Sequence, residues 1–227
     1  VFVQCCIFRE GFQLESAEAI VDVSQCPDAP WTMDIIHSLV DQSFLNIKHL
    51  PDGQTRLFMY ESIRKYGYNK LEKEGSIIIN KQSITGTKSR NALELRHAKH
   101  FSSFGTDGYL QSIYTKGGVH QFEKLLKELE NLRLAVNNSI AQNQANIAIQ
   151  NACGIGLILK MNGPFTEGEL LFQKLIDAFS DQLTPTVMSR VFMHLSMFQR
   201  MVKRLDIALH NNLKALNFAI KSGDALG

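Results

Sequence analysis

The stretch Cys6-Ile7-Phe8-Arg9-Glu10-Gly11-Phe12 opens the part of the chain that decides its fold, which runs to Leu71. It is followed by an amphipathic run, then by Leu39-Val40-Asp41-Gln42-Ser43-Phe44 and by the strand-like run Arg56-Leu57-Phe58-Met59-Tyr60. Glu61-Ser62-Ile63-Arg64-Lys65-Tyr66 then returns to a helical pattern. We interpret these segments as one small folded unit, and we expect it to need a partner module on its N-terminal side.

Two helices are predicted near the start of this unit. Between Phe12 and Val23 the apolar residues recur with a helical period, and two glutamates stand near the N-terminal end, where the helix dipole favours acidic groups. After the break Pro27-Asp28-Ala29-Pro30, Thr32 is the predicted N-cap of a second helix. Its apolar stripe ends near Ser43 and consists of Met33, Ile35, Ile36, Leu39 and Val40.

A β-hairpin is predicted to close the unit. The strand-like runs 44–48 and 56–60 flank Leu50-Pro51-Asp52-Gly53-Gln54, in which Pro-Asp-Gly is a strong turn signal. The start of the chain, Val1-Phe2-Val3-Gln4-Cys5-Cys6, has the look of a further helix. Three helices followed by a hairpin is the order of a winged helix. The sequence therefore predicts a mainly α fold, in which a winged-helix unit with a small β-hairpin is followed by antiparallel helical hairpins.

The composition is that of a soluble globular protein with one elongated domain or two compact ones. The 227 residues are 44% hydrophobic and carry a net charge of +2, and no apolar run approaches the roughly 18 residues that a membrane span needs. The four cysteines have neither the paired spacing of a metal site nor a favourable disulfide geometry, because two of them are adjacent. We therefore expect a reduced, cytoplasmic protein. The abrupt start at Val1 favours a segment cut from a larger regulator.

Charge is distributed unevenly along the chain. The segment 1–60 contains three basic and eight acidic side chains, a net charge of −5, whereas the segment 61–104 contains nine basic and four acidic ones, a net charge of +5. The predicted recognition helix, 31–44, carries Asp34, His37 and Asp41 and has neither Lys nor Arg. Because phosphates would repel this unit, we expect these three side chains to face a protein partner rather than DNA.

Three segments of this unit resemble the winged-helix segment that follows the nucleotide-binding module in STAND-type signalling ATPases. The patterns of that family are Val-Phe-x-Gly-Gly-Phe, Leu-Val-Asp-x-Ser-Leu and Leu-x-Glu-x-Ile-Arg-x-Tyr. The matching segments here are Ile7-Phe8-Arg9-Glu10-Gly11-Phe12, Leu39-Val40-Asp41-Gln42-Ser43-Phe44 and Phe58-Met59-Tyr60-Glu61-Ser62-Ile63-Arg64-Lys65-Tyr66. Glu10 replaces the first glycine, and Phe44 replaces the leucine. Two later segments, 96–101 and 128–135, are similar to helical elements of the same family.

The resemblance implies a regulatory and protein-interaction role. The winged helix would pack on the protein's own nucleotide-binding module in the resting state, and helical repeats would sense an inducer or partner. ATP would bind upstream in the parent protein, which would be an ATPase or be fused to a cyclase or kinase module, while this segment would hold no cofactor. The alternative is a winged-helix transcription regulator that contacts DNA.

The middle of the chain is expected to form a loop and connecting helices. Residues 77–89 interrupt the helical pattern, and Gly86-Thr87-Lys88-Ser89 within them lacks the spacing of a phosphate-binding loop. His97 and His100 share one predicted helix, three positions apart, and could hold a metal, but no third ligand stands nearby, which favours packing or solvated histidines. Residues 119–141 predict one long helix.

The C-terminal part is predicted to contain a repeat. When the chain is aligned with itself at an offset of 40 residues, Gly168 is aligned with Ala208. This offset, which we call the repeat offset, resembles the period of a lengthened tetratricopeptide repeat, in which small residues allow close helix contacts. Leu183-Thr184-Pro185 is expected to start one helix, and Ser222-Gly223-Asp224 to end the last one. Generic antiparallel hairpins without repeat ancestry are the alternative.

Three domains are predicted from these observations. They are 1–74 (winged helix), 75–141 (loop and connecting helices) and 142–227 (truncated tetratricopeptide-like repeats). Because two repeats are fewer than the three or so that a solenoid usually needs, we expect more to follow Gly227.

No catalytic arrangement emerges from the sequence, so we do not expect an enzyme. Phe192, Met193, Phe198 and Met201 are most simply core residues of the helical layers, although they could line a groove for a partner helix. We therefore predict protein partners, without direct DNA contact, membrane binding or metal. The candidate interaction residues are Asp34, His37, Asp41, Phe192 and Phe198.

Overall fold

The computed structural model describes residues 1–26, 28–50, 53–79 and 81–223. These residues are mainly α-helical, with two short antiparallel strand pairs. They form two compact units, Val1–His100 and Phe101–Gly227, and the division falls within one helix, Thr87–Ser102. Each unit is therefore described by itself.

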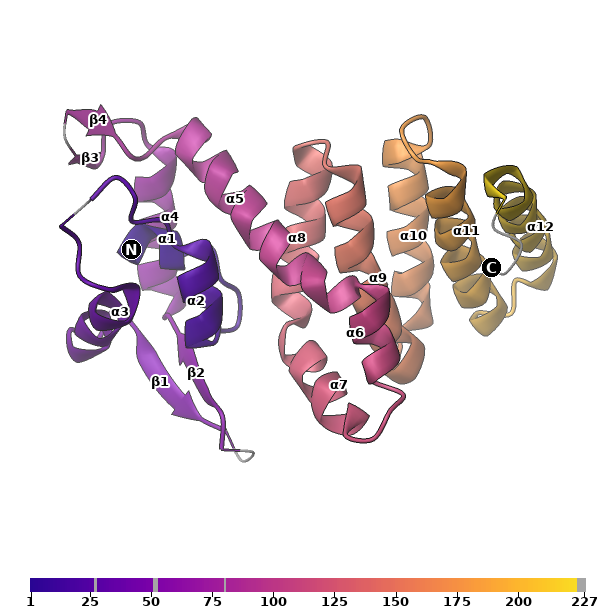
Figure 1. Cartoon of the computed structure of the whole chain (residues 1–227), viewed down its shortest axis with the longest axis horizontal. Coiled ribbons are helices and arrows are strands. Elements are labelled where there is room, and N and C mark those ends of the chain that lie inside the picture. Colours follow the sequence, from indigo (N-terminus) through magenta and orange to yellow (C-terminus); the bar gives the residue numbers. More distant parts are fainter. Residues whose placement is uncertain (27, 51–52, 80, 224–227) are drawn as a thin grey trace. The chain divides into compact units, whose positions relative to one another are not determined.

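The first unit contains the predicted helices and hairpin. Helix α1 packs against α4, α2 packs against α3, and strands β1 and β2 form an antiparallel hairpin (Figure 1). In this hairpin Ile47 pairs with Leu57, and Lys48 pairs with Arg56. The elements are α1 (Phe2–Cys5), α2 (Leu14–Ile20), α3 (Thr32–Asp41), β1 (Asn46–His49), β2 (Thr55–Phe58), α4 (Glu61–Glu72), β3 (Ile78–Ile79), β4 (Gln82–Ser83) and α5 (Thr87–Ser102).

Local details of the first unit differ from the sequence prediction. Thr32 is the first residue of α3 rather than its N-cap; Trp31 holds that position, and it has no side-chain capping hydrogen bond. The predicted loop 77–89 contains the β3–β4 pair and ends early, because α5 begins at Thr87. Pro51 and Asp52 of the predicted turn lie outside the described residues, as does Pro27. Gly53 beside them has a positive φ of 79°.

Glu10 and Gly11 form a turn that brings Phe12 onto strand β2. Both have positive φ, 53° and 97°, a conformation that glycine adopts at low cost and glutamate does not. The turn is closed from β2, because Arg56 Nη2 donates to the Gly11 carbonyl at 2.8 Å. A Cβ at Gly11 would also lie 2.8 Å from the carbonyl oxygen of Leu57. A pair of glycines, as in the pattern that this segment resembles, would suit both positions.

The two histidines of α5 take part in packing and hydrogen bonding. His97 is fully buried, and its ring lies 5.8 Å from that of Phe8. His100 Nε2 lies 3.1 Å from Ser16 Oγ, and burial lowers its pKa. Arg96, the residue before His97, donates from Nε to the Ile20 carbonyl at 2.8 Å. These contacts tie α5 to α2 within the first unit.

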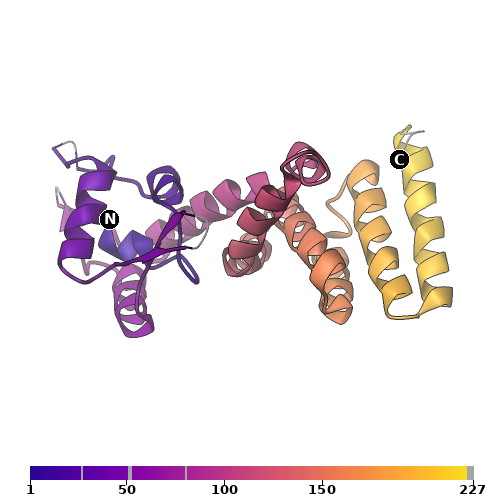
Figure 2. The same ribbon diagram turned by 90° about the horizontal axis from the view of Figure 1, so that it is seen from below.

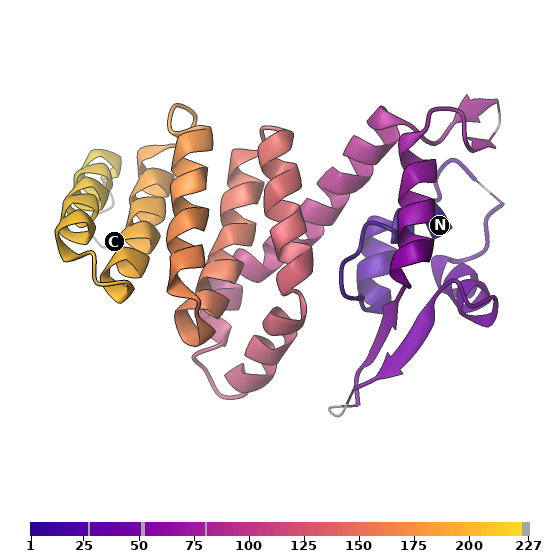
Figure 3. The ribbon, with the colours of Figure 1, turned by 180° about the vertical axis from the view of Figure 1, so that it is seen from behind.

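The second unit is a row of antiparallel helices. From α8 onward each helix packs on the next, and the row is visible from the front and from behind (Figures 1 and 3). Helix α9 is its most buried member, with a continuous buried run from Asn151 to Leu159. The elements are η1 (Ser103–Gly105), α6 (Asp107–Ser112), α7 (Gly118–Lys127), α8 (Leu129–Ala141), α9 (Ala145–Asn162), α10 (Phe165–Phe179), α11 (Pro185–Met201) and α12 (Leu205–Ser222).

The single long helix predicted over 119–141 is wrong. The structure divides it into α7 and α8 at Glu128, which has φ −100° and ψ 7°. Its carboxylate is buried and accepts a hydrogen bond from Asn131 Nδ2 at 2.7 Å. An uninterrupted apolar period cannot reveal such a break, because the period continues across it.

The helix boundaries follow the repeat offset. Helix α9 begins at Ala145 and α11 at Pro185, and the same interval separates the starts of α10 and α12. Helix α11 starts at Pro185, as predicted, and the Thr184 side chain caps it by accepting from the backbone N of Val187. Gly223, in the left-handed conformation, ends α12. Asp224 of the predicted stop lies outside the described residues.

Candidate interaction groove

The predicted interaction residues fall into an exposed set and a buried set. Asp34, His37 and Asp41 are exposed on α3, whose buried side carries Ile36 and Leu39. By contrast, the two phenylalanines of α11 are interior residues: Phe198 is fully buried, and the Phe192 ring stacks on Phe218 at 5.8 Å. Their burial fits the core-packing alternative, and the two sets belong to different units.

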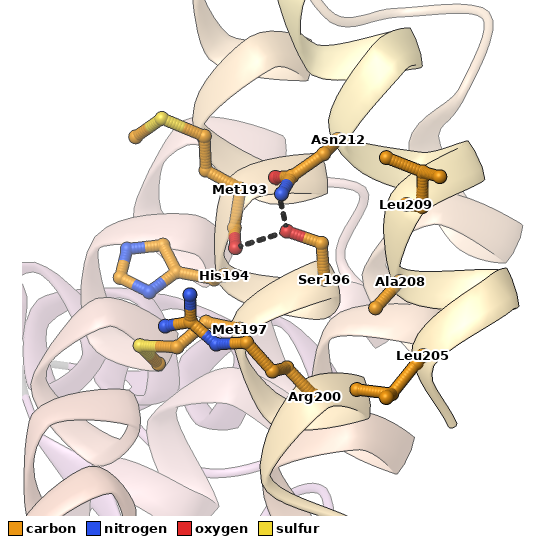
Figure 4. Close-up of a pocket in the computed structure, with 9 residues that line it drawn as sticks. All are labelled: Met193, His194, Ser196, Met197, Arg200, Leu205, Ala208, Leu209 and Asn212. Atoms are coloured by element: carbon orange, nitrogen blue, oxygen red, sulfur yellow. Dashed lines mark hydrogen bonds between the residues drawn. The ribbon is translucent and has the colours of Figure 1, made fainter. Parts of the chain in front are cut away.

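A groove of about 470 Å³ lies between α11 and α12 (Figure 4). Its apolar walls come from Met193 and Met197 on α11 and from Leu205 and Leu209 on α12, and Ala208 also lines it. We call it the α11–α12 groove. Of the four α11 residues considered as groove candidates from the sequence, Phe192, Met193, Phe198 and Met201, only Met193 lines the groove.

Polar groups also line the α11–α12 groove. Ser196 Oγ lies 2.6 Å from Asn212 Oδ1 and 2.9 Å from the Met193 carbonyl oxygen (Figure 4). Arg200 is exposed at the groove and forms no ion pair with any described residue. The groove thus combines apolar walls with a free positive charge.

The apolar lining continues along α12 as an exposed row. We call the residues of this row, all at least half exposed, the apolar row of α12. They recur at helical spacing and are Leu205, Leu209, Leu213, Leu216 and Ile220. Figure 2 shows α12 at the end of the helical row, packed on α11. Exposed apolar surface of this extent next to a groove is typical of an interaction site.

The groove also borders a half-buried histidine, which lies against a buried cysteine. Cys153 Sγ lies 3.8 Å from His194 Nε2, and the His194 ring stacks on Phe172. Burial raises the pKa of Cys153 to about 12, and burial together with the cations Arg190 and Lys160 lowers the pKa of His194 to about 4. Both groups are therefore neutral near pH 7. A nucleophilic cysteine needs the opposite shifts, toward thiolate and imidazolium.

The described residues provide few other chemical features. No group of three or more His, Cys, Asp or Glu side chains within them is arranged to hold a metal ion. The four cysteines are all free thiols. None of the helices in the described ranges combines the length and the apolar character needed to cross a membrane.

Comparison with known proteins adds no family to this description. No family model matches the chain, and searches of curated proteins and of solved structures found no match.

Sequence reasoning missed the groove, although its signal was present. The spacing of the leucines from Leu205 to Leu216 is visible in the sequence, but it was not interpreted as an exposed stripe. Whether such a stripe is covered depends on the neighbouring helix, which a period alone does not specify.

Proposed function

We propose that this chain is a non-catalytic regulatory and protein-interaction segment of a STAND-like signalling ATPase, as the resemblance of its motifs implies. Its helical hairpins bind a partner or inducer and couple that binding to an upstream, ATP-binding module. The acidic first unit docks on that module through α3, with Asp34, His37 and Asp41 at the contact. The setting is cytoplasmic.

One observation carries the proposal: the apolar row of α12 lies exposed beside the α11–α12 groove. Leaving five large aliphatic side chains in water is unfavourable, by about 25 cal/mol for each Å² of apolar surface that a partner would cover. Grooves that combine apolar walls with a few polar groups commonly accept a helix. This surface therefore supports protein binding better than catalysis.

The alternative function is DNA binding by a winged helix. It is favoured only by the order of helices and hairpin in the first unit, because α3 presents Asp34 and Asp41 and no basic residue. A salt-dependent titration with duplex DNA separates the two functions. If α3 docks on protein, the chain should not bind duplex DNA, whereas DNA binding that falls steeply with salt would indicate phosphate contacts and favour the alternative.

Photo-crosslinking in cells tests the proposed function directly. We expect benzoylphenylalanine at Leu213, in the apolar row of α12, to form adducts with protein. The matched control is the same probe at Thr186, an exposed residue at the start of α11. Equal adduct yields at both positions, or adducts with nucleic acid or lipid, would contradict protein binding at this surface.

A further inference from the structure

The pair α9–α10 precedes the pair α11–α12 by the repeat offset, so what packs on the first pair indicates what fits the groove of the second. In the first hairpin, α9 and α10 are covered by α11, whose Phe198 packs against Gly168. His194 and Phe198 also stack on Phe172, with ring centroids 4.6 and 5.9 Å away. The hairpin α9–α10 thus binds a helix that inserts two ring side chains. We call the surface of a hairpin on which such a helix packs its seat.

Adding the repeat offset to the residue numbers of this seat gives residues of the α11–α12 groove. After this shift, the residues of α9 and α10 that meet His194, Phe198 or Arg204 become groove residues of α11 and α12. These seat residues are Cys153, Gly156, Gly168, Glu169 and Phe172. Their counterparts are Met193, Ser196, Ala208, Leu209 and Asn212, and all five line the groove. The first seat holds a helix, and the second is open within the described part of the chain.

The charge of the second seat differs from that of the first. In the first seat the acidic side chain is Glu169 of the hairpin α9–α10, and it accepts a hydrogen bond from Arg204 at 2.9 Å. In the second seat Leu209 takes the place of Glu169, and the free charge is Arg200. The segment 185–222 contains six Lys and Arg side chains and one Asp, a net charge of +5. An incoming helix is therefore favoured when it carries acidic residues.

We propose that the α11–α12 groove binds an acidic amphipathic helix of a partner protein, which occupies the position that α11 occupies on α9 and α10. A large apolar side chain of this helix lies over Ala208, as Phe198 lies over Gly168, and a carboxylate pairs with Arg200. The proposal rests on the proposed function and specifies the chemistry of the partner.

Two peptides derived from the chain test this proposal. The acidic probe is a stapled helical peptide that spans 185–204, with Arg190, Arg200, Lys203 and Arg204 replaced by glutamate. The basic control is the unaltered sequence. Fluorescence anisotropy with the full chain should show binding of the acidic peptide at least about tenfold tighter than binding of the basic one, and this binding should weaken as salt is added.

Variants of the chain locate the binding. Leu209→Glu should abolish binding of the acidic peptide, and Arg200→Glu should reverse the preference toward the basic peptide. Both residues are exposed, so neither change disturbs the core. Leu170→Glu is the matched control, because Leu170 is 70% exposed on α10, compared with 63% for Leu209, and lies outside the groove.

Several results would overturn the inference. These are equal binding of the two peptides, equal losses in Leu209→Glu and Leu170→Glu, and binding to anionic phosphatidylserine vesicles that depends on Leu209, since the last would indicate a membrane surface. An adduct of the Leu213 probe within its own polypeptide would also contradict a partner protein. If that probe captures a protein but the acidic peptide does not bind, the proposed function stands and this inference fails. If both experiments fail, both are wrong.

Discussion

At the scale of single residues, Gly168 is a position at which a buried aromatic ring leaves no room for a Cβ. A Cβ there would lie 2.5 Å from Cδ1 of Phe198, well inside van der Waals contact. Because Phe198 is itself fully buried, it has little space to retreat. We expect Gly168→Ala to destabilise the second unit by about 1–3 kcal/mol despite the better helix propensity of alanine, measured by chemical denaturation.

Gly108 provides the control for that substitution. It lies in α6, and a Cβ there would meet nothing within 4 Å. Gly108→Ala should therefore stabilise the protein, by about 0.5–1 kcal/mol, through helix propensity alone. Changes of opposite sign in the two variants are the expected result, whereas a stabilised Gly168→Ala would show that the α10–α11 contact is looser than the structure indicates.

His194 makes the stability of the second unit depend on pH. Burial, with the cations Arg190 and Lys160 nearby and partly offset by Asp107, lowers its pKa from 6.5 to about 4. As pH falls from 6.5 to about 4, the unfolded chain takes up a proton that the folded chain does not, so stability is lost across this window. We expect a loss of at most about 3 kcal/mol, since the ring is partly exposed.

The His194→Gln variant isolates this effect. Its free energy of unfolding should fall less steeply than that of the parent between pH 6.5 and 4, and His100 contributes equally to both proteins. Parallel pH profiles for parent and variant would mean that His194 is more solvated than its surroundings suggest.

At the scale of elements, α3 allows a test of what its acidic residues do. Asp34 lies in the first turn, where the helix dipole favours an acid, and Asp41 is the last helical residue, where the dipole favours a base. Asp34→Lys should therefore cost about 0.3–1 kcal/mol, and Asp41→Lys should gain a similar amount. Thermal unfolding of the single and double variants checks this, and the double variant should resemble the parent.

Because the double variant should stay folded, it can also be used to test docking of the first unit. In a full-length protein it should weaken docking of the first unit on its neighbour while the unit itself stays folded, because the core of α3 is Ile36 and Leu39. Unchanged docking would show that α3 is not the contact surface.

At the scale of the whole molecule, we expect the chain to bind no nucleotide. Gly86 stands just before α5, but the carboxylate of Glu74 lies against it, where a phosphate would have to bind. An anion at that helix N-terminus opposes a second one. Calorimetric titration with ATP and Mg²⁺ should therefore give no saturable signal, and micromolar binding would contradict the proposed division of labour with an upstream module.

Structural features that depend on interactions between residues close in sequence were mostly predicted correctly, and features that depend on tertiary contacts were not. Thr184 before Pro185, and Gly223 after α12, are local start and stop signals, so these helix ends were predictable. Strands β1 and β2 were predicted within about two residues of their observed bounds for the same reason, whereas β3 and β4 were predicted as a loop. The break at Glu128 was missed, because the apolar period continues across it. What accompanies the break is a buried hydrogen bond between Asn131 and Glu128, which no local pattern reveals.

The sequence by itself determined the helical class, the hairpin and the regular spacing of the last four helices, since these depend on capping, turn chemistry and periodicity within short windows. Only the tertiary structure decided that Phe192 and Phe198 are interior and that the leucines of α12 are exposed. Both sets have the same apolar chemistry and helical spacing. What separates them is whether another helix lies against them, and that is a property of the packed molecule rather than of any local stretch of residues.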